Sequence, residues 1–242
     1  PHKHYQNNLW RVAGMIMLLD RRLVAGLALV PLFCLGGICG RLFLAVRAGP
    51  AVVVDPGHGG IDGGCQDGRG NLEKDLNLAI SRRVAAHLRE AGYAAHLTRA
   101  DDRALGETYG RDLMARVDAA RQTRARALVS VHANWCRDPS ATGALMVVPP
   151  AAPQSMRLAK AIGARLQGLC PVNPEPLVMP DHPLLAAESF PIVLVEVGFL
   201  SNPAEAARLQ TAAYQDALGR AIAQGIEDFL RAAPPAAIRS TR

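Results

Sequence analysis

Three apolar segments of strand length each end close to a titratable side chain. These side chains are His58, His132 and Glu196, which follow the segments at 52–54, 128–131 and 192–195. The carboxyl ends of parallel strands form the ligand crevice of an open α/β sheet, so we expect the three side chains at one edge. A glycine-rich loop at 57–64, whose small residues let backbone and substrate approach closely, separates the first segment from Glu73.

Two histidines and one glutamate are the protein ligands of a common type of catalytic zinc site, which keeps a further position open. Structural zinc sites are instead closed by four ligands rich in cysteine. An open position favours hydrolysis, because zinc lowers the pKa of water to about 7 while a second carboxylate, for which Glu196 is placed, moves the proton. The structural alternative is that the histidines are satisfied within the fold and that Glu73 is a first-turn residue favoured by the helix dipole.

From residue 50 onward, short apolar segments alternate with segments of helical periodicity. This alternation predicts an α/β fold in which helices cover both faces of a sheet. We expect helices within 76–91, 113–124, 156–169 and 215–230, and a loop in the proline-rich segment 171–183. The expected strands are the three named above together with 94–97 and 144–148.

Six motifs occur in a defined order: VVVDPGHGGIDGG, NLEKDLNLAI, LTRADD, Arg116 followed by Ala119-Ala120, LVSVHAN and PIVLVEVGFLSNP. In this order and spacing they resemble the zinc-dependent N-acetylmuramoyl-L-alanine amidases of the amidase-3 type. The resemblance covers residues 50–232 and implies a single α/β domain with a mostly parallel, twisted sheet of about six strands. It also implies that His58, Glu73 and His132 bind one Zn²⁺ ion and that Glu196 is the catalytic glutamate.

The reaction implied by the resemblance is hydrolysis of the peptidoglycan amide that joins N-acetylmuramic acid to L-alanine of the stem peptide. A short chain whose strand ends in LVEVGFLSNP is similar to germination-type amidases, which help make muramic lactam in spore cortex; a division or recycling amidase is the alternative. A deacetylase or an activating protein is a candidate partner. Two other functions remain open: a non-catalytic peptidoglycan-binding or regulatory module with the same fold, and a zinc carboxypeptidase acting on the stem peptide.

Several other polar residues are candidates for roles near the site. We expect Asp55 to tie the glycine loop together through backbone N–H groups, and we expect His87 and His96 to lie away from the crevice. The candidate substrate contacts are Arg99, Arg116 and Asn134, although the two arginines are expected to pair with carboxylates such as Asp102. His182 and Glu188 are expected in a solvated loop, with a place at the cleft border as the alternative. Free thiols are expected at Cys65 and Cys136, with a Cys65–Cys136 disulfide as the alternative, and the sequence leaves the state of Cys170 open.

The chain of 242 residues carries a net charge of +6, but residues 1–49 hold six basic residues against one acidic residue. The remaining chain is nearly neutral, which argues against nucleic acid as a partner. Residues 23–40 contain no charged side chain, and basic residues precede this segment, so the domain is expected on the extracytoplasmic side of the membrane. It is either anchored there or, after cleavage near Ala48, secreted.

These observations divide the chain into four parts. Residues 1–22 are a leader, whose first part is interpreted as a mis-called start before Met15 or Met17, and residues 23–47 are the transmembrane or signal segment. Residues 50–232 are the catalytic domain, and residues 233–242 are a flexible tail.

Overall fold

The computed structural model describes residues 49–186 and 190–232, which all belong to one compact unit, Gly49–Arg242. The predicted leader, the predicted apolar segment at 23–47 and the predicted tail at 233–242 lie outside the described residues. Among the helices that the structure describes, none combines the length and apolar character needed to cross a bilayer.

The described part of the chain contains six strands, five α-helices and one short 3₁₀ helix. The strands are β1 (Ala51–Pro56), β2 (Ala94–Leu97), β3 (Leu128–Asn134), β4 (Leu145–Val148), β5 (Leu177–Val178) and β6 (Ile192–Phe199). The helices are α2 (Glu73–Glu90), α3 (Tyr109–Gln122), α4 (Pro153–Leu166), η1 (Pro183–Leu185), α5 (Pro203–Leu209) and α6 (Ala212–Ala232).

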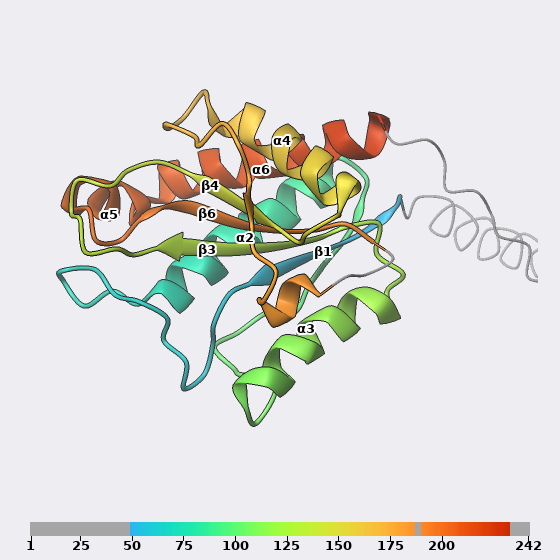
Figure 1. Ribbon diagram of the computed structural model, residues 1–242, viewed down its shortest axis with the longest axis horizontal. Helices are drawn as coiled ribbons and strands as arrows, with labels where there is room; N and C mark the ends of the chain where they lie inside the picture. The colour runs from blue at the N-terminus through green and yellow to red at the C-terminus, as the bar shows by residue number, and fades with distance from the viewer. Residues whose placement is uncertain (1–48, 187–189, 233–242) are drawn as a thin grey trace, which may run out of the picture. The chain divides into compact units, whose positions relative to one another are not determined.

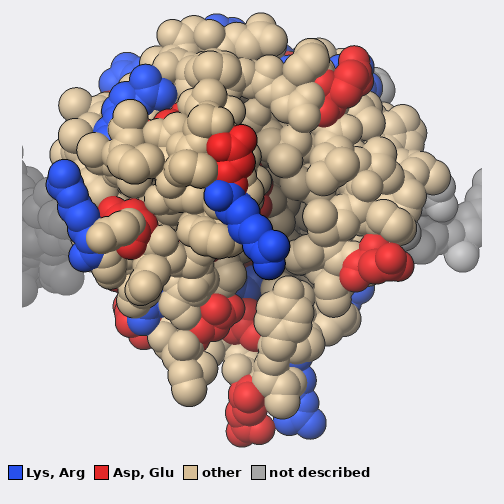
Figure 2. Space-filling view, turned by 60° about the vertical axis from the view of Figure 1, so that its left-hand side comes forward, with Lys and Arg blue, Asp and Glu red and all other residues tan. Residues whose placement is uncertain are grey.

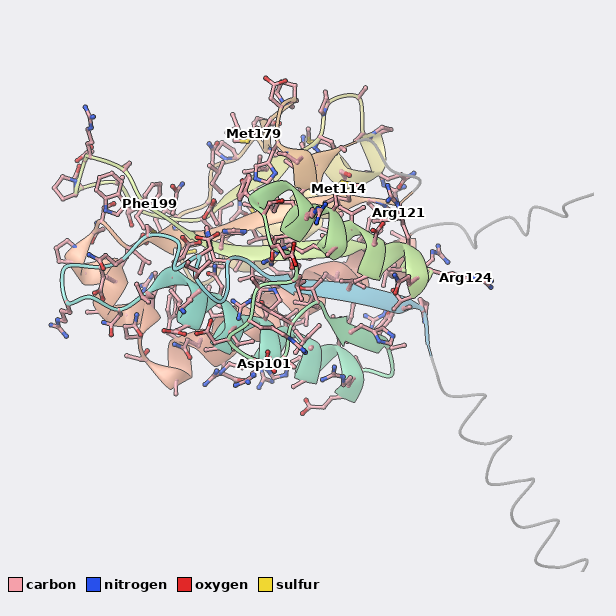
Figure 3. All side chains as sticks on the ribbon, turned by 90° about the horizontal axis from the view of Figure 1, so that it is seen from below. Asp101, Met114, Arg121, Arg124, Met179 and Phe199 are labelled. Carbon is pink, nitrogen blue, oxygen red and sulfur yellow. The ribbon has the colours of Figure 1, made fainter. Side chains whose placement is uncertain are left out.

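The strands form one sheet in the order β2-β1-β3-β6-β4-β5. The four strands β2, β1, β3 and β6 are parallel, whereas β4 runs antiparallel to β6 and pairs in parallel with β5. In Figure 3 the label Phe199, the last residue of β6, marks the carboxyl ends of the parallel strands. The label Arg124, a residue before β3, marks their amino ends. The predicted α/β domain with a mostly parallel sheet of six strands is therefore confirmed.

Helices cover both faces of the sheet (Figure 1). One face packs against α2, α4 and α6, and the other packs against α3 and η1, which gives two separate clusters of buried apolar residues. The central strands have almost no exposed surface; Val52 to Val54, for example, are all 0% exposed. Strands buried on both faces are typical of parallel sheets, and their burial keeps the carboxyl edge in a fixed position.

The main differences between the structure and the sequence prediction are at four elements. Helix α3 begins at Tyr109, four residues before the predicted start, because the Thr108 side chain accepts a hydrogen bond from the Arg111 backbone N–H and caps the helix. Helix α5 was not predicted, although Asn202 caps it in the same way and Pro203 occupies its first turn. The segment predicted as a proline-rich loop contains the two-residue strand β5 and the helix η1.

A buried ion pair under the glycine loop corrects the prediction for Asp55. The Asp55 carboxylate, which is 0% exposed, accepts hydrogen bonds from Arg116 Nη1 at 2.8 Å, from Ser130 Oγ at 2.6 Å and from the Thr98 hydroxyl, and it accepts none from the N–H groups of the loop. Burial alone would raise the pKa of Asp55, but Arg116 and the hydroxyl groups of Ser130 and Thr98 together outweigh burial and lower it. Arg116 in turn donates to the carbonyl oxygens of Pro56 at 2.7 Å and His58 at 2.9 Å. Arg116 therefore fixes the loop through its backbone carbonyl oxygens, and the ion pair with Asp55 fixes the position of Arg116.

Replacing Arg116 with methionine is expected to destabilise the fold by about 3–5 kcal/mol, because it leaves Asp55 buried without its countercharge. Denaturant unfolding monitored by circular dichroism measures this loss. The matched control is Arg111→Met on the same helix, since the Arg111 side chain is 74% exposed and its ion pair with Glu107 should contribute less than about 1 kcal/mol. A cost for Arg116→Met as small as that of the control would contradict the role given to the buried pair.

Candidate metal centre

The structure brings the three strand-end side chains to one edge of the sheet, as the strand pattern predicts. Strands β1, β3 and β6 are neighbours of the same direction, and His132 on β3 pairs directly with Glu196 on β6. His58 follows β1 by two residues and has a positive φ of 59°. This backbone conformation is uncommon for a residue other than glycine, and residues held in it concentrate at functional sites.

Glu73, the first residue of α2, lies between the two histidines. Its Oε2 is 3.1 Å from His58 Nε2, and its Oε1 is 2.9 Å from His132 Nδ1. The centroids of the two imidazole rings are 4.9 Å apart. One ligand atom from each of the three residues lies within 4.8 Å of the others. Zinc bonds to nitrogen and oxygen are about 2.0–2.2 Å long, so ligand atoms on one ion lie at most about twice this distance apart. Small side-chain adjustments would therefore let a single ion bind all three residues.

Neighbouring groups orient these side chains. The Asp62 carboxylate accepts a hydrogen bond of 2.8 Å from His58 Nδ1, which leaves the Nε2 of the neutral ring free to bind a metal. Glu73 Oε2 accepts from the Cys65 backbone N–H at 3.0 Å, and Oε1 accepts from Asn77 Nδ2 at 3.0 Å. Such partners fix the direction of ligand lone pairs before a metal arrives.

The charges within the cluster suit a cation. Burial alone would raise the pKa of Glu73, but His132 and His58 outweigh it and hold the carboxylate ionised. Burial alone would lower the pKa of His58, but Glu73 and Asp62 together raise it to about 9. A metal binds the neutral ring, so metal binding at neutral pH displaces a proton from this histidine.

Glycines let the loop approach the cluster closely. A Cβ atom added to Gly57 would lie 2.2 Å from the His132 ring, and one added to Gly64 would lie 2.5 Å from Glu73 Oε2. Gly64 also has a φ of +67°, in the region that favours glycine. At these two positions glycine therefore leaves the space that the candidate metal ligands occupy.

Replacing Gly57 with alanine is expected to reduce zinc affinity by about 10-fold or more, because the methyl group displaces the His132 ring. Zinc titration against a competing chelator measures the change. Gly68→Ala is the matched control, since no atom lies within 4 Å of its added Cβ atom. Equal affinities of the two variants, both folded by circular dichroism, would show that His132 does not bind the metal in the position described.

Glu196 lies next to the cluster but is not part of it. Its Oε2 is buried and has no hydrogen-bond partner among the described residues. Burial raises the pKa of this carboxyl group to about 7, with a further contribution from Glu73 and an opposing one from the histidines. A buried carboxylate oxygen without a hydrogen-bond partner lowers the stability of the fold. The presence of the Glu196 carboxyl group beside three candidate ligands therefore favours a role in binding or moving a proton.

An active-site pocket of about 210 Å³ is lined by His58, His132, Glu196, His182 and Met179 among others. The expectation that His182 lies in a solvated loop is therefore wrong, and the alternative at the cleft border is correct. The signal for this position was present in the sequence, because Leu184 and Leu185 follow His182 and their burial draws the segment against the sheet. The predicted cleft residue Glu188 lies outside the described residues.

Of the three candidate substrate contacts, the two arginines are buried within the fold and Asn134 lies at the end of β3. Arg99 and Arg116 are only 1% and 2% exposed. Arg99 donates to the carbonyl oxygens of Pro56, Gly57, Lys74 and Asp101, so both guanidinium groups are used within the fold. The expected partner Asp102 instead pairs with Lys74 at 2.7 Å. Asn134 lies at the end of β3, where its side chain accepts a hydrogen bond of 2.7 Å from the backbone N–H of the next residue, Trp135.

The histidines predicted to lie elsewhere do so, and the domain cysteines are free thiols in the structure. His87 contacts Asp216 at 2.9 Å, and His96 is exposed on β2. Cys65 Sγ donates to the Ala133 carbonyl oxygen at 3.3 Å, and Cys136 Sγ donates to the Asp138 carbonyl oxygen at 3.2 Å.

Comparison with known families gives one decisive match. The family model described as Amidase_3, N-acetylmuramoyl-L-alanine amidase, matches residues 52–228, most of the chain. The chain belongs to this amidase family. The protein is thus a hydrolase of the N-acetylmuramoyl-L-alanine amidase class, and the cluster of His58, Glu73 and His132 lies within the matched region.

Individual relatives agree with this family assignment. The chain is 33% identical to the germination-specific N-acetylmuramoyl-L-alanine amidase of Bacillus subtilis over 188 residues, which cover 74% of this chain and 79% of the relative. It is 30% identical to the amidase AmiA of Escherichia coli over 223 residues, which cover 74% and 75% of the two chains. The structure of the CwlD amidase from Clostridioides difficile in complex with the GerS lipoprotein superposes with a TM-score of 0.70 and 30% identity, covering 76% of this chain and 99% of that one.

Proposed function

We propose that this amidase hydrolyses the bond between N-acetylmuramic acid and L-alanine of peptidoglycan and that it depends on one Zn²⁺ ion held by His58, Glu73 and His132. The observation that carries the proposal is the set of three ligand atoms within 4.8 Å of one another beside the unpartnered oxygen of Glu196. Two nitrogens and one carboxylate oxygen form a donor set that fits a catalytic zinc ion.

The side chains divide the chemistry between them. A bound zinc ion supplies Lewis acidity, which polarises the amide carbonyl and makes a water molecule more acidic. Glu196 accepts the proton from the attacking water and returns it to the nitrogen of L-alanine as that nitrogen leaves. Because burial raises the pKa of Glu196 to about 7, the carboxyl group can both accept and donate a proton near neutral pH.

Mass spectrometry of digested peptidoglycan tests the bond that is cut. We expect free stem peptides that begin with L-alanine, together with glycan strands that carry unsubstituted muramic acid. Release of a C-terminal amino acid alone, with muramic acid still substituted, would identify a carboxypeptidase instead. Binding to peptidoglycan without any product would favour a non-catalytic module.

The similarity to a germination-specific amidase supports a role in spore cortex, and the comparable similarity to AmiA supports a division or recycling role as the alternative. We place the catalytic domain on the extracytoplasmic side of the cytoplasmic membrane, anchored by residues 23–47 or secreted after their removal. The complex of the CwlD neighbour with a lipoprotein supports an activating partner for this chain also. Protease added to protoplasts should degrade the domain, and full protection would overturn this location.

A further inference from the structure

A second hollow, about four times larger than the active-site pocket, begins at the metal ligands. It measures about 870 Å³ and is lined by three segments: residues 64–69, the loop residues Trp135, Cys136, Arg137 and Pro139, and, around the start of α5, Leu200, Ser201, Pro203, Ala206 and Ala207. We call it the basic groove. Gly64 lies between the groove and the candidate metal ligands, because a Cβ atom added to Gly64 would be 2.5 Å from Glu73 Oε2 and 2.7 Å from the His58 ring. Figure 2, which brings the carboxyl ends of the strands toward the viewer, shows this face hollowed, with both basic and acidic side chain atoms beside the hollow.

Two arginines give the basic groove its charge. Arg69 and Arg137 line opposite loops, and both are exposed. Neither forms an ion pair with a carboxylate of residues 49–186 or 190–232. Asp67, the acidic residue of the lining, is only 6% exposed, and its oxygens already accept hydrogen bonds from Arg69 N, Asn71 N and Asn71 Nδ2. Burial alone would raise the pKa of Asp67, but these hydrogen bonds lower it, and the charge of Arg69 adds to their effect without a direct ion pair. The groove therefore offers two guanidinium groups to a ligand with negative charges.

An exposed tryptophan forms part of the same lining. Trp135 follows β3 directly, three residues after the metal ligand His132, and 52% of its surface is exposed. A large aromatic side chain left exposed beside a catalytic centre suggests contact with a ligand, because its ring gains most free energy when it is covered.

The groove is formed before a ligand arrives. One wall is tied to α2 by a hydrogen bond of 2.8 Å from Glu73 N to the Cys65 carbonyl oxygen. The other wall is tied to the turn after β6 by hydrogen bonds from Cys136 N to Ser201 Oγ at 3.2 Å and from Leu200 N to the Asn134 carbonyl oxygen at 2.8 Å. Little ordering is needed on binding, which favours affinity.

We propose that the basic groove binds the stem peptide of the substrate, with Arg69 and Arg137 pairing with its carboxylates and Trp135 packing on its aliphatic atoms. This inference rests on the proposed function, since a scissile amide at the cluster places the peptide and the sugar on different sides of the metal. The stem peptide is the part of the substrate with free carboxylates, whereas the sugar rings are largely uncharged. The charge of the groove therefore favours the peptide over the glycan.

Kinetics with two matched substrates test the inference. The substrates are N-acetylmuramoyl-L-alanyl-D-glutamate and its diamide, in which both carboxylates are replaced by carboxamides. The wild-type full chain loaded with zinc should show a KM about 10-fold lower for the acid than for the diamide. Arg69→Gln and Arg137→Gln should each raise the KM for the acid several-fold, leave that for the diamide unchanged and keep kcat within about twofold. Trp135→Ala should raise KM for both substrates.

The control is Arg220→Gln on α6, whose side chain is 60% exposed and which should change neither KM. If the two groove arginine variants change KM for acid and diamide equally, or change neither, the inference is wrong. A loss that grows with the number of sugar residues and not with the carboxylates would assign the groove to the glycan and would also overturn it. The proposed function fails separately, if the wild-type chain releases neither L-alanyl-D-glutamate from the acid nor the diamide of this dipeptide from the diamide substrate.

Discussion

Alanine at position 132 is expected to abolish zinc binding and amide hydrolysis together. His132 offers one of the three candidate ligand atoms, and its ring lies against Gly57 and Glu73. Changes in the partners of metal ligands already reduce affinity or activity by about 10–100-fold, so loss of a ligand should exceed 100-fold. Zinc content after gel filtration and product release from peptidoglycan measure the two effects independently.

Two further variants make this test specific. Glu73→Gln keeps the size of the ligand but removes its charge, so it should also lose zinc while the fold measured by circular dichroism persists. His96→Ala removes an exposed histidine from the edge strand β2, which contributes no residue to the cluster, and should keep full zinc content and activity. If His132→Ala retains stoichiometric zinc, the ligand set is different from the one described. If it loses zinc but keeps full activity, the amidase does not depend on the metal.

The sequence was most informative where the polar residues interrupt apolar strands. Val52 to Val54 and Ile192 to Val195 are buried on both faces of the sheet, and strands of this kind can be recognised from composition alone. Because parallel neighbours end at the same edge, the approach of His132 to Glu196 followed from the pattern without any distance. The antiparallel direction of β4 could not be predicted, since the apolar residues at 145–148 are equally compatible with a parallel and an antiparallel strand.

The buried polar contacts were harder to predict, because they depend on which face of an element a side chain occupies. Proximity in sequence predicts that Asp55 contacts the glycine loop, yet its partner Arg116 lies 61 residues away on α3. The sequence identifies Arg116 as part of a motif. Because its side chain is only 2% exposed, it contacts the loop and not the substrate. The basic groove was missed for a related reason: Arg69 and Arg137 belong to loops that adjoin only after β1, β3 and α2 have packed.

Glu196→Gln is expected to separate metal binding from chemistry. The amide has nearly the shape of the carboxyl group, so the fold and the zinc content should match those of the wild type, while the group that accepts the proton from water is lost. A positioned general acid/base contributes about 10²–10⁴-fold to the rate, and kcat should fall by that factor with a much smaller change in KM.

The structure explains why no neighbour can replace this carboxylate. Glu196 Oε2 is buried without a partner, and the other carboxylates near the cluster are occupied, Glu73 by the two histidines and Asp62 by His58. His182 is the remaining titratable side chain of the pocket wall with a buried unpartnered nitrogen, but burial lowers its pKa, with His132 adding to the effect, and this makes it a weaker base. His182→Ala is therefore the matched control and should lose far less activity than Glu196→Gln. If the order of the two variants is reversed, the proton is transferred by the histidine and the assignment of Glu196 is wrong.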